Sequence, residues 1–224
     1  HQYLPKSEFH NLGSAFGNNE RVHSDAYSKL VTVNGLEKRF AEIMQIPAFI
    51  KKHDLIKVNL GPNVNFFGKQ LFFVITIENA SLFSQFANLV SFRRFKGQMK
   101  NTANVVGWTA NDESLHAQAG IDILNIIFKE NPHFKEVYDQ SYLNAILTDY
   151  INIEIEMLDW IYEHGELPWF TKYDVINFMK NRINNAVVQM DYKKVFEIDQ
   201  ESLFKMKWFD EEIYSDAMDD FFAT

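Results

Sequence analysis

The sequence predicts an all-α protein built as a bundle of long antiparallel helices. Apolar residues recur at spacings of three and four along most of the 224 residues. Turn signals are few, with 9 Gly and 5 Pro in the whole chain. The apolar-polar alternation that marks strands joined by hairpin turns appears nowhere. Helices of about 30 residues would each span about 45 Å, which suits a bundle, and we expect a single domain over residues 1–224.

Gly, Pro and Asn divide the chain into seven expected helices. The first has Ser7 as its expected N-cap and stops at Asn34-Gly35. The expected helices cover about residues 7–33, 36–44, 48–60, 65–95, 101–129, 134–164 and 172–192. Residues 72–77 alone have strand propensity, but the length of the segment 65–95 favours a buried helix. Beyond residue 192 we expect only short, acidic segments that carry aromatic side chains.

Charge and composition exclude several classes of function. The net charge of −8 argues against a general nucleic-acid binder. No apolar run reaches the ~18 residues needed to cross a bilayer. A hydrophobic fraction of 46% also excludes a disordered chain, so we expect a folded cytoplasmic protein. Because the chain contains no cysteine, carboxylate and imidazole groups must hold any metal.

Two short motifs carry the chemistry of the chain. Glu20-Arg-Val-His23 lies in the first expected helix and Glu113-Ser-Leu-His116 in the fifth. In each, a carboxylate and an imidazole three residues apart share one helix face. A single such pair is also common on a solvated face. Two pairs on two long helices are the pattern of ferritin-like di-metal carboxylate bundles, and oxygen ligands with two imidazoles suit iron or manganese.

A third carboxylate stands in an apolar setting. Glu78 is the only acid between Ile56 and Asn111, and large apolar residues precede and follow it. Burial of an unpaired carboxylate costs several kcal/mol, and metal coordination is one way to offset that cost. A structural, hydrogen-bonded glutamate is the alternative. Glu154 and Glu156 point to different faces of their helix, at least one toward solvent, and neither is assigned to the metal site.

These motifs together resemble one known family, the small, radical-generating subunit of class I ribonucleotide reductase. The resemblance depends on Glu20 to Tyr27, on Glu78 with the aromatic run after it, and on Asp112 to His116. Lesser similarities are Ser91 to Phe95, Trp208 to Glu212 and Asp220 to Phe222. The similar motifs occur in the family's order along essentially the whole chain.

The resemblance implies a role for each of these positions. Tyr27, one helical turn after His23, would be oxidised to a radical; Asp112 would orient a ligand histidine and relay the electron. Phe86 would help to keep the centre dry. Two ions of iron, manganese or one of each would react with oxygen, and a large subunit would then reduce the ribonucleoside diphosphate for deoxyribonucleotide synthesis. A homodimer is also implied. The metal ligands would be Glu20, His23, Glu78, Glu113 and His116, with Glu20 bridging the two ions.

Two departures from the family pattern stand out. In the family, a helix before the first motif carries a sixth carboxylate ligand and a relay tryptophan, and this sequence shows no counterpart of that helix before Glu20. The family also has a C-terminal tail, which we would expect to start near Asp220 to Phe222. We therefore expect an N-terminal companion segment, on the same or another polypeptide, to supply that ligand, and the chain alone not to sustain a tyrosyl radical. Two other hypotheses remain: a di-metal oxidase or hydroxylase for a small apolar substrate, and a metal-storage or purely structural helical protein.

Overall fold

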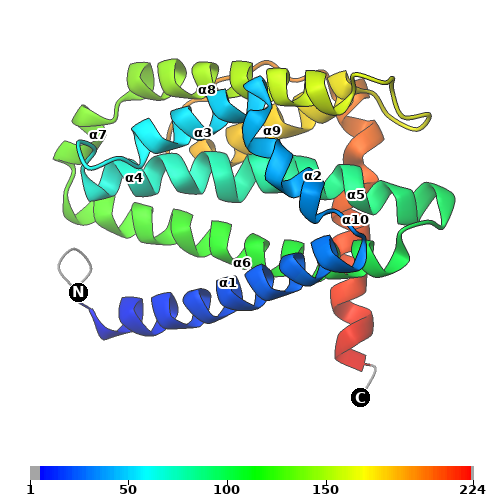
Figure 1. The fold of residues 1–224 in the computed structure, drawn as a ribbon. Helices are drawn as coiled ribbons and strands as arrows, with labels where there is room; N and C mark the ends of the chain where they lie inside the picture. Colours follow the sequence, from blue (N-terminus) through cyan, green and yellow to red (C-terminus); the bar gives the residue numbers. More distant parts are fainter. Residues whose placement is uncertain (1–5, 223–224) are drawn as a thin grey trace. The chain divides into compact units, whose positions relative to one another are not determined.

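The computed structural model describes residues 6–222, and for residues 214–222 it describes the backbone alone (Figure 1). Every regular element in this range is helical, which confirms the all-α prediction. No helix in this range is long and apolar enough to cross a membrane. The elements are α1 (Ser7–Val33), α2 (Glu37–Glu42), η1 (Ile43–Gln45), α3 (Pro47–Asn59), α4 (Phe66–Phe73), η2 (Val74–Ser81), α5 (Leu82–Lys96), α6 (Lys100–Glu130), α7 (His133–Val137), α8 (Gln140–Ile161), α9 (Lys172–Gln189) and α10 (Gln200–Phe222).

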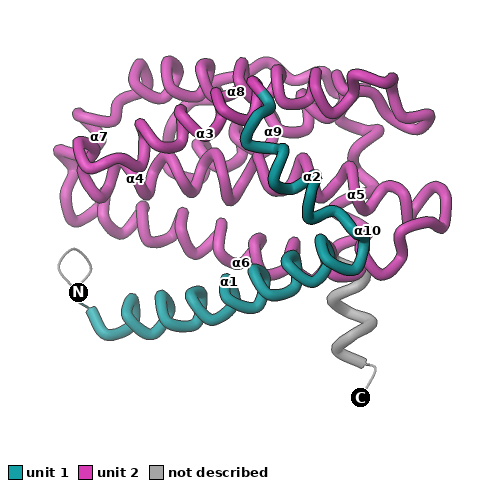
Figure 2. Tube along the Cα trace, viewed as in Figure 1, with its two compact units in different colours: residues 1–46 teal, residues 47–224 magenta. Residues whose placement is uncertain are grey.

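The chain divides into two compact units, His1–Ile46 and Pro47–Thr224 (Figure 2). The first contains α1, α2 and η1, and the second contains all the other helices. The single ferritin-like domain expected over the whole chain stays a prediction, and each unit is described by itself.

In the first unit, α1 has the predicted bounds, Ser7–Val33, but a different N-cap residue. Its N-cap is Lys6, in an extended conformation, and the hydroxyl of Ser7 donates to Glu8 inside the helix, so the prediction of Ser7 as N-cap is wrong. The predicted stop is confirmed. The Asn34 N–H donates to the Leu30 carbonyl, and Gly35 adopts a φ of 64°, the left-handed conformation that commonly ends helices.

In the second unit, α4, η2 and α5 form one continuous helical rod through residues 66–96 (Figure 1). This confirms a helix where local propensity alone suggests a strand. The sequence did not predict that η2 is a π-helix. α6 and α9 both pack on η2. α6 approaches closely because residue 120 is glycine: a Cβ there would lie 2.5 Å from Val74 Cγ2.

Two predictions about the later helices are corrected. The helix expected over 134–164 is two helices, because Asp139 accepts a hydrogen bond from the Tyr142 N–H at 2.8 Å and caps the start of α8. The segment expected to be short pieces is the 23-residue helix α10. The side chains of Asp220 to Phe222, part of the family resemblance, lie outside the described residues.

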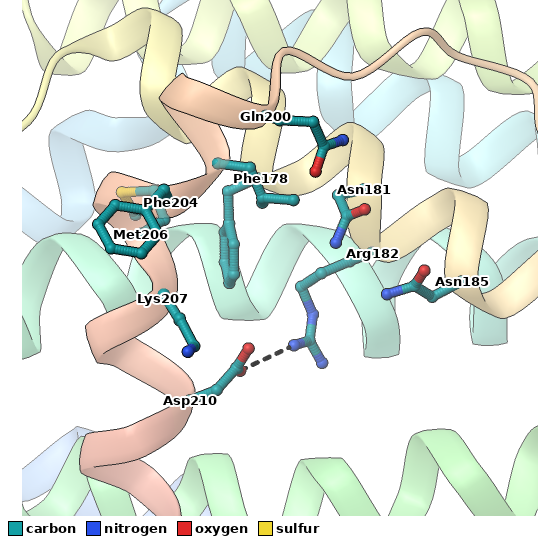
Figure 3. Close-up of a pocket in the computed structure, with 10 residues that line it drawn as sticks. Phe178, Asn181, Arg182, Asn185, Gln200, Phe204, Met206, Lys207 and Asp210 are labelled. Carbon is teal, nitrogen blue, oxygen red and sulfur yellow. Dashed lines mark hydrogen bonds and ion pairs between the residues drawn. The ribbon is translucent and has the colours of Figure 1, made fainter.

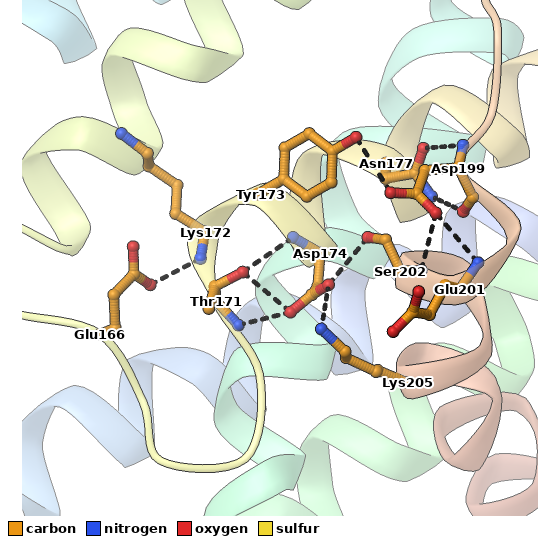
Figure 4. Close-up of polar contacts among 10 residues, drawn as sticks. All are labelled: Glu166, Thr171, Lys172, Tyr173, Asp174, Asn177, Asp199, Glu201, Ser202 and Lys205. Carbon is orange, nitrogen blue, oxygen red and sulfur yellow. Dashed lines mark hydrogen bonds and ion pairs between the residues drawn. The ribbon is translucent and has the colours of Figure 1, made fainter.

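The starts of α9 and α10 are joined by a polar clasp, which we define as Thr171, Asp174, Asn177, Asp199, Ser202 and Lys205 (Figure 4). Thr171 and Asp174 form a capping box on α9. The second oxygen of Asp174 accepts from the Ser202 hydroxyl of α10 at 2.8 Å. Asp199 accepts from the Ser202 N–H at 3.1 Å and caps α10. The clasp caps the start of α10 and bonds it to α9, and farther along the helix Met206 and Phe209 are fully buried.

Candidate metal centre

α6 presents the second motif as the sequence predicts. Glu113 and His116 are 3% and 5% exposed, and the distance from His116 Nδ1 to Glu113 Oε2 is 3.1 Å. The 31 residues of α6 are unbroken α-helix, so the three-residue spacing alone brings both side chains to one face. This face is buried, which excludes the interpretation of this pair as a solvated surface pair.

η2 presents Glu78, which is 7% exposed. The Leu82 N–H donates to the Ile77 carbonyl five residues earlier, the bonding pattern of a π-helix. Seven of the eight residues of η2 are buried, Glu78 among them. π-helical turns inside α-helices are frequent at functional sites.

The two helices bring three ligand groups together. Glu78, Glu113 and His116 each offer one ligand atom, and these atoms all lie within 4.8 Å of one another. Two carboxylates this close in a buried setting repel each other, and a bound cation would offset both the repulsion and the cost of burial. Carboxylate oxygens with one imidazole suit iron or manganese. The donor set therefore fits a metal ion, and it has the composition of one half of a di-metal carboxylate centre.

α1 carries the first motif. Glu20 and His23 form an i,i+3 pair with Nδ1 and Oε2 3.8 Å apart, and their side chains are 54% and 8% exposed. Tyr27 follows one turn later and is half-buried. That Glu20 and His23 are metal ligands, and Tyr27 a radical site, stays a prediction.

Similarity to known proteins decides the family. The family model "Ribonucleotide reductase, small chain" matches residues 1–202. The chain belongs to the ribonucleotide reductase small-chain family.

Relatives and solved structures agree with this membership. The "Probable ribonucleoside-diphosphate reductase small subunit" of Invertebrate iridescent virus 3 is 23% identical over 217 residues, 88% of this chain and 57% of the relative. The protein with the same description from Invertebrate iridescent virus 6 is 27% identical over 187 residues, which are 72% of this chain and 51% of the relative. The chain thus spans about half the length of these curated relatives.

A solved structure shows the fold. The "putative class I ribonucleotide reductase" of Bacillus halodurans superposes with a TM-score of 0.82 at 18% identity, covering 93% of this chain and 77% of that one. The likeness confirms the ferritin-like fold class for the small-chain family member described here.

Two further positions come from the family resemblance. Phe86 of α5 is 5% exposed, and its ring lies edge-on to Phe83, with centroids 5.9 Å apart. Asp112, next to Glu113 on α6, is half-buried. Their roles, keeping the centre dry and orienting a histidine, stay predictions.

Sequence reasoning missed the polar groups that support η2. Lys52 of α3 forms an ion pair with Glu154 of α8, with Nζ and Oε1 2.8 Å apart and Glu154 fully buried. Glu156 pairs instead with Lys51 at 2.6 Å near solvent, as its different helix face predicts. Each of the two acids is thus paired with a lysine of α3. The apolar neighbours of Glu154 in Ile-Glu-Ile-Glu signalled a buried acid, but nothing local pointed to Lys52.

Proposed function

We propose that this chain acts in the cytoplasm as the radical-generating small subunit of a class I ribonucleoside-diphosphate reductase. The observation that carries the proposal is the buried cluster of Glu78, Glu113 and His116 in a member of the small-chain family. The substrate class follows from the two viral relatives, which are described as probable ribonucleoside-diphosphate reductase small subunits. In this role the chain pairs with a large catalytic subunit and forms a homodimer.

In this proposal two metal ions are held by residues from three helices. Glu78, Glu113 and His116 would provide one set of ligands, and Glu20 and His23 of α1 would provide the rest, with Glu20 as a ligand to both ions. When bound, the metal pair supplies the reaction with oxygen that makes a strong one-electron oxidant. Iron and manganese both suit these ligands, and a companion segment supplies a further carboxylate.

The protein groups do the remaining work. Tyr27 would lose one electron to the oxidant that the bound metal pair supplies and its phenolic proton to water, and would so become the radical. Asp112 orients a ligand histidine and helps to relay the oxidising equivalent toward the large subunit. The buried rings of α5, Phe86 among them, exclude water that would quench a radical. Because nucleotide reduction takes place on the large subunit, the substrate does not contact this chain.

The test combines spectroscopy with a coupled assay. The full-length protein, loaded anaerobically with Fe(II) or Mn(II) and exposed to air, should show an organic-radical signal by electron paramagnetic resonance. With a matching large subunit, it should support reduction of a ribonucleoside diphosphate. Tyr27→Phe should remove both signal and activity, whereas Tyr3→Phe, at a tyrosine without a proposed role, should keep both. Reduction that survives in Tyr27→Phe would place the radical at the metal pair instead of Tyr27, whereas no reduction by the metal-loaded wild-type protein would contradict the proposal.

A further inference from the structure

The segment that holds Glu78 is the least regular in its rod. η2 extends over eight residues as a π-helix between two α-helices. The i→i+5 pattern is rare and occurs mostly as single turns, so a longer segment needs support from outside. A change of one residue in the hydrogen-bonding register would turn the following side chains by about 100° around the helix axis. The direction of Glu78 therefore depends on whatever keeps η2 in this register.

Three neighbouring helices bond directly to η2. The Tyr150 hydroxyl of α8 donates to the Thr76 carbonyl at 2.9 Å. The Arg182 Nε of α9 donates to the Asn79 carbonyl at 2.6 Å. The Lys52 Nζ of α3 donates to the Ser81 hydroxyl at 2.5 Å. The accepting residues flank Glu78 on both sides.

Arg182 makes the contact closest in sequence to Glu78, on the next residue. The Asn79 side chain also donates to the Val74 carbonyl five residues earlier at 2.7 Å, so residue 79 is held from both ends. The Arg182 guanidinium lies 3.6 Å from the centroid of the ring of Phe83, the second residue of α5, and this is a cation-π contact. The planar guanidinium of Arg182 thus contacts both the π-helix and the start of α5.

Arg182 is also reached from solvent. It lines a pocket of about 290 Å³ between α9 and α10, together with Phe178, Asn185 and Lys207 (Figure 3). Within this pocket its Nη1 lies 3.5 Å from Asp210 of α10. Burial raises the pKa of Asp210, and Arg182 partly opposes that shift. The pocket offers enough room for a small guanidinium compound to take the place of a truncated side chain.

We propose that Arg182 is a positioning residue for Glu78: its bond to the Asn79 carbonyl keeps η2 in π register and aims the carboxylate at Glu113 and His116. The inference rests on the proposed function in one respect, that Glu78 is a metal ligand. It assigns to Arg182 no contact with metal or substrate. It predicts that Arg182 affects metal binding through Glu78 and by no other route.

A double-mutant cycle tests this route. Anaerobic Mn²⁺ titration of the full chain, with free Mn²⁺ followed by its six-line paramagnetic signal, gives the dissociation constant. Arg182→Met should weaken binding about tenfold, the scale of outer-shell changes at metal sites. In a Glu78→Gln background the same substitution should change the constant less than about twofold, because the group it aims no longer bears charge. Lys207→Met, in the same pocket, should leave the constant unchanged.

Rescue of metal affinity distinguishes a positioning role of Arg182 from a role in folding alone. Arg182→Lys, which keeps a donor and a charge, should recover part of the affinity, and methylguanidinium added to Arg182→Ala should recover more. If Arg182→Met fails to fold by circular dichroism, the cycle is run with Arg182→Lys. Equal losses in both Glu78 backgrounds, or no loss in either, would overturn the inference and leave the proposed function intact. Unchanged binding in Glu78→Gln alone would overturn both.

Discussion

The two segments that form the buried cluster of Glu78, Glu113 and His116 are built in opposite ways. α6 presents Glu113 and His116 from an unbroken α-helix, where the spacing of three residues suffices. η2 presents Glu78 from a π-helix that α3, α8 and α9 hold in place through Lys52, Tyr150 and Arg182. One half of the cluster is therefore determined locally, and the other half by tertiary contacts.

The largest loss of metal binding should follow a substitution on α6, the segment whose geometry is determined locally. Glu113→Gln removes a charged ligand while it keeps size and helix propensity, so we expect Mn²⁺ binding at the cluster to weaken by more than the about tenfold expected for outer-shell changes. Glu156→Gln, which changes an exposed acid paired with Lys51, is the matched control and should bind as the wild type does. Isothermal titration calorimetry measures both. Full binding by Glu113→Gln would show that the cluster is not the metal site.

The next largest effect should be a loss of stability when a residue that supports η2 is replaced. Lys52→Met leaves Glu154 charged and fully buried without its partner, and such a loss costs about 3–5 kcal/mol of unfolding free energy. Lys51→Met removes only an exposed pair, worth about 0–1 kcal/mol. Urea unfolding of both variants gives the comparison. Equal costs for the two lysines would argue against a special role of the buried pair.

The contact between the two segments predicts a smaller effect. In Gly120→Ala the new methyl group meets Val74 of η2, and such overpacking costs about 1–3 kcal/mol. Gly17→Ala, in α1, meets nothing within 4 Å and should instead stabilise by about 1 kcal/mol through helix propensity. Thermal unfolding of each variant should show shifts of opposite sign. A stabilising Gly120→Ala would mean that α6 and η2 are less closely packed than described.

A region away from both segments provides the smallest and most specific prediction. Burial by itself raises the pKa of Asp174, but hydrogen bonds from Thr171 and Ser202, with Lys205 nearby, outweigh it and lower the pKa overall. A carboxyl with a lowered folded-state pKa stabilises above its unfolded pKa of about 3.9, and this contribution is lost as pH falls through the folded value. Wild-type stability should therefore fall more steeply than that of Asp174→Asn below about pH 4. Parallel urea curves at pH 3 to 7 would contradict this.

The sequence predicts the locally determined helices well and the features that depend on tertiary contacts poorly. The bounds of α1 and α6, and the pairing of Glu113 with His116, depend on helix periodicity and local stop signals, and periodicity predicts them well. The π register of η2 leaves no local mark, because Phe72 to Ile77 show only apolar character and strand propensity. The supports of η2 join residues 29 to 103 positions apart, and no spacing rule reaches that far.

α10 shows the same limit. Its acidic, aromatic sequence hides a buried apolar face that includes Phe209 and Ile213, and its start is capped by Asp199 and bonded through Ser202 to Asp174 of α9. A capping acid before a helix can be recognised from sequence, but its partner on another helix cannot. The family resemblance proposes the site residues and predicts none of these supports.

The most direct test of the account is the position of a metal ion. Crystals of the full chain grown with Mn²⁺ and measured at the manganese absorption edge would locate the ion by anomalous scattering. The account predicts a strong peak within bonding distance of Glu78, Glu113 and His116. A strong peak elsewhere, with none at these three residues, would contradict it.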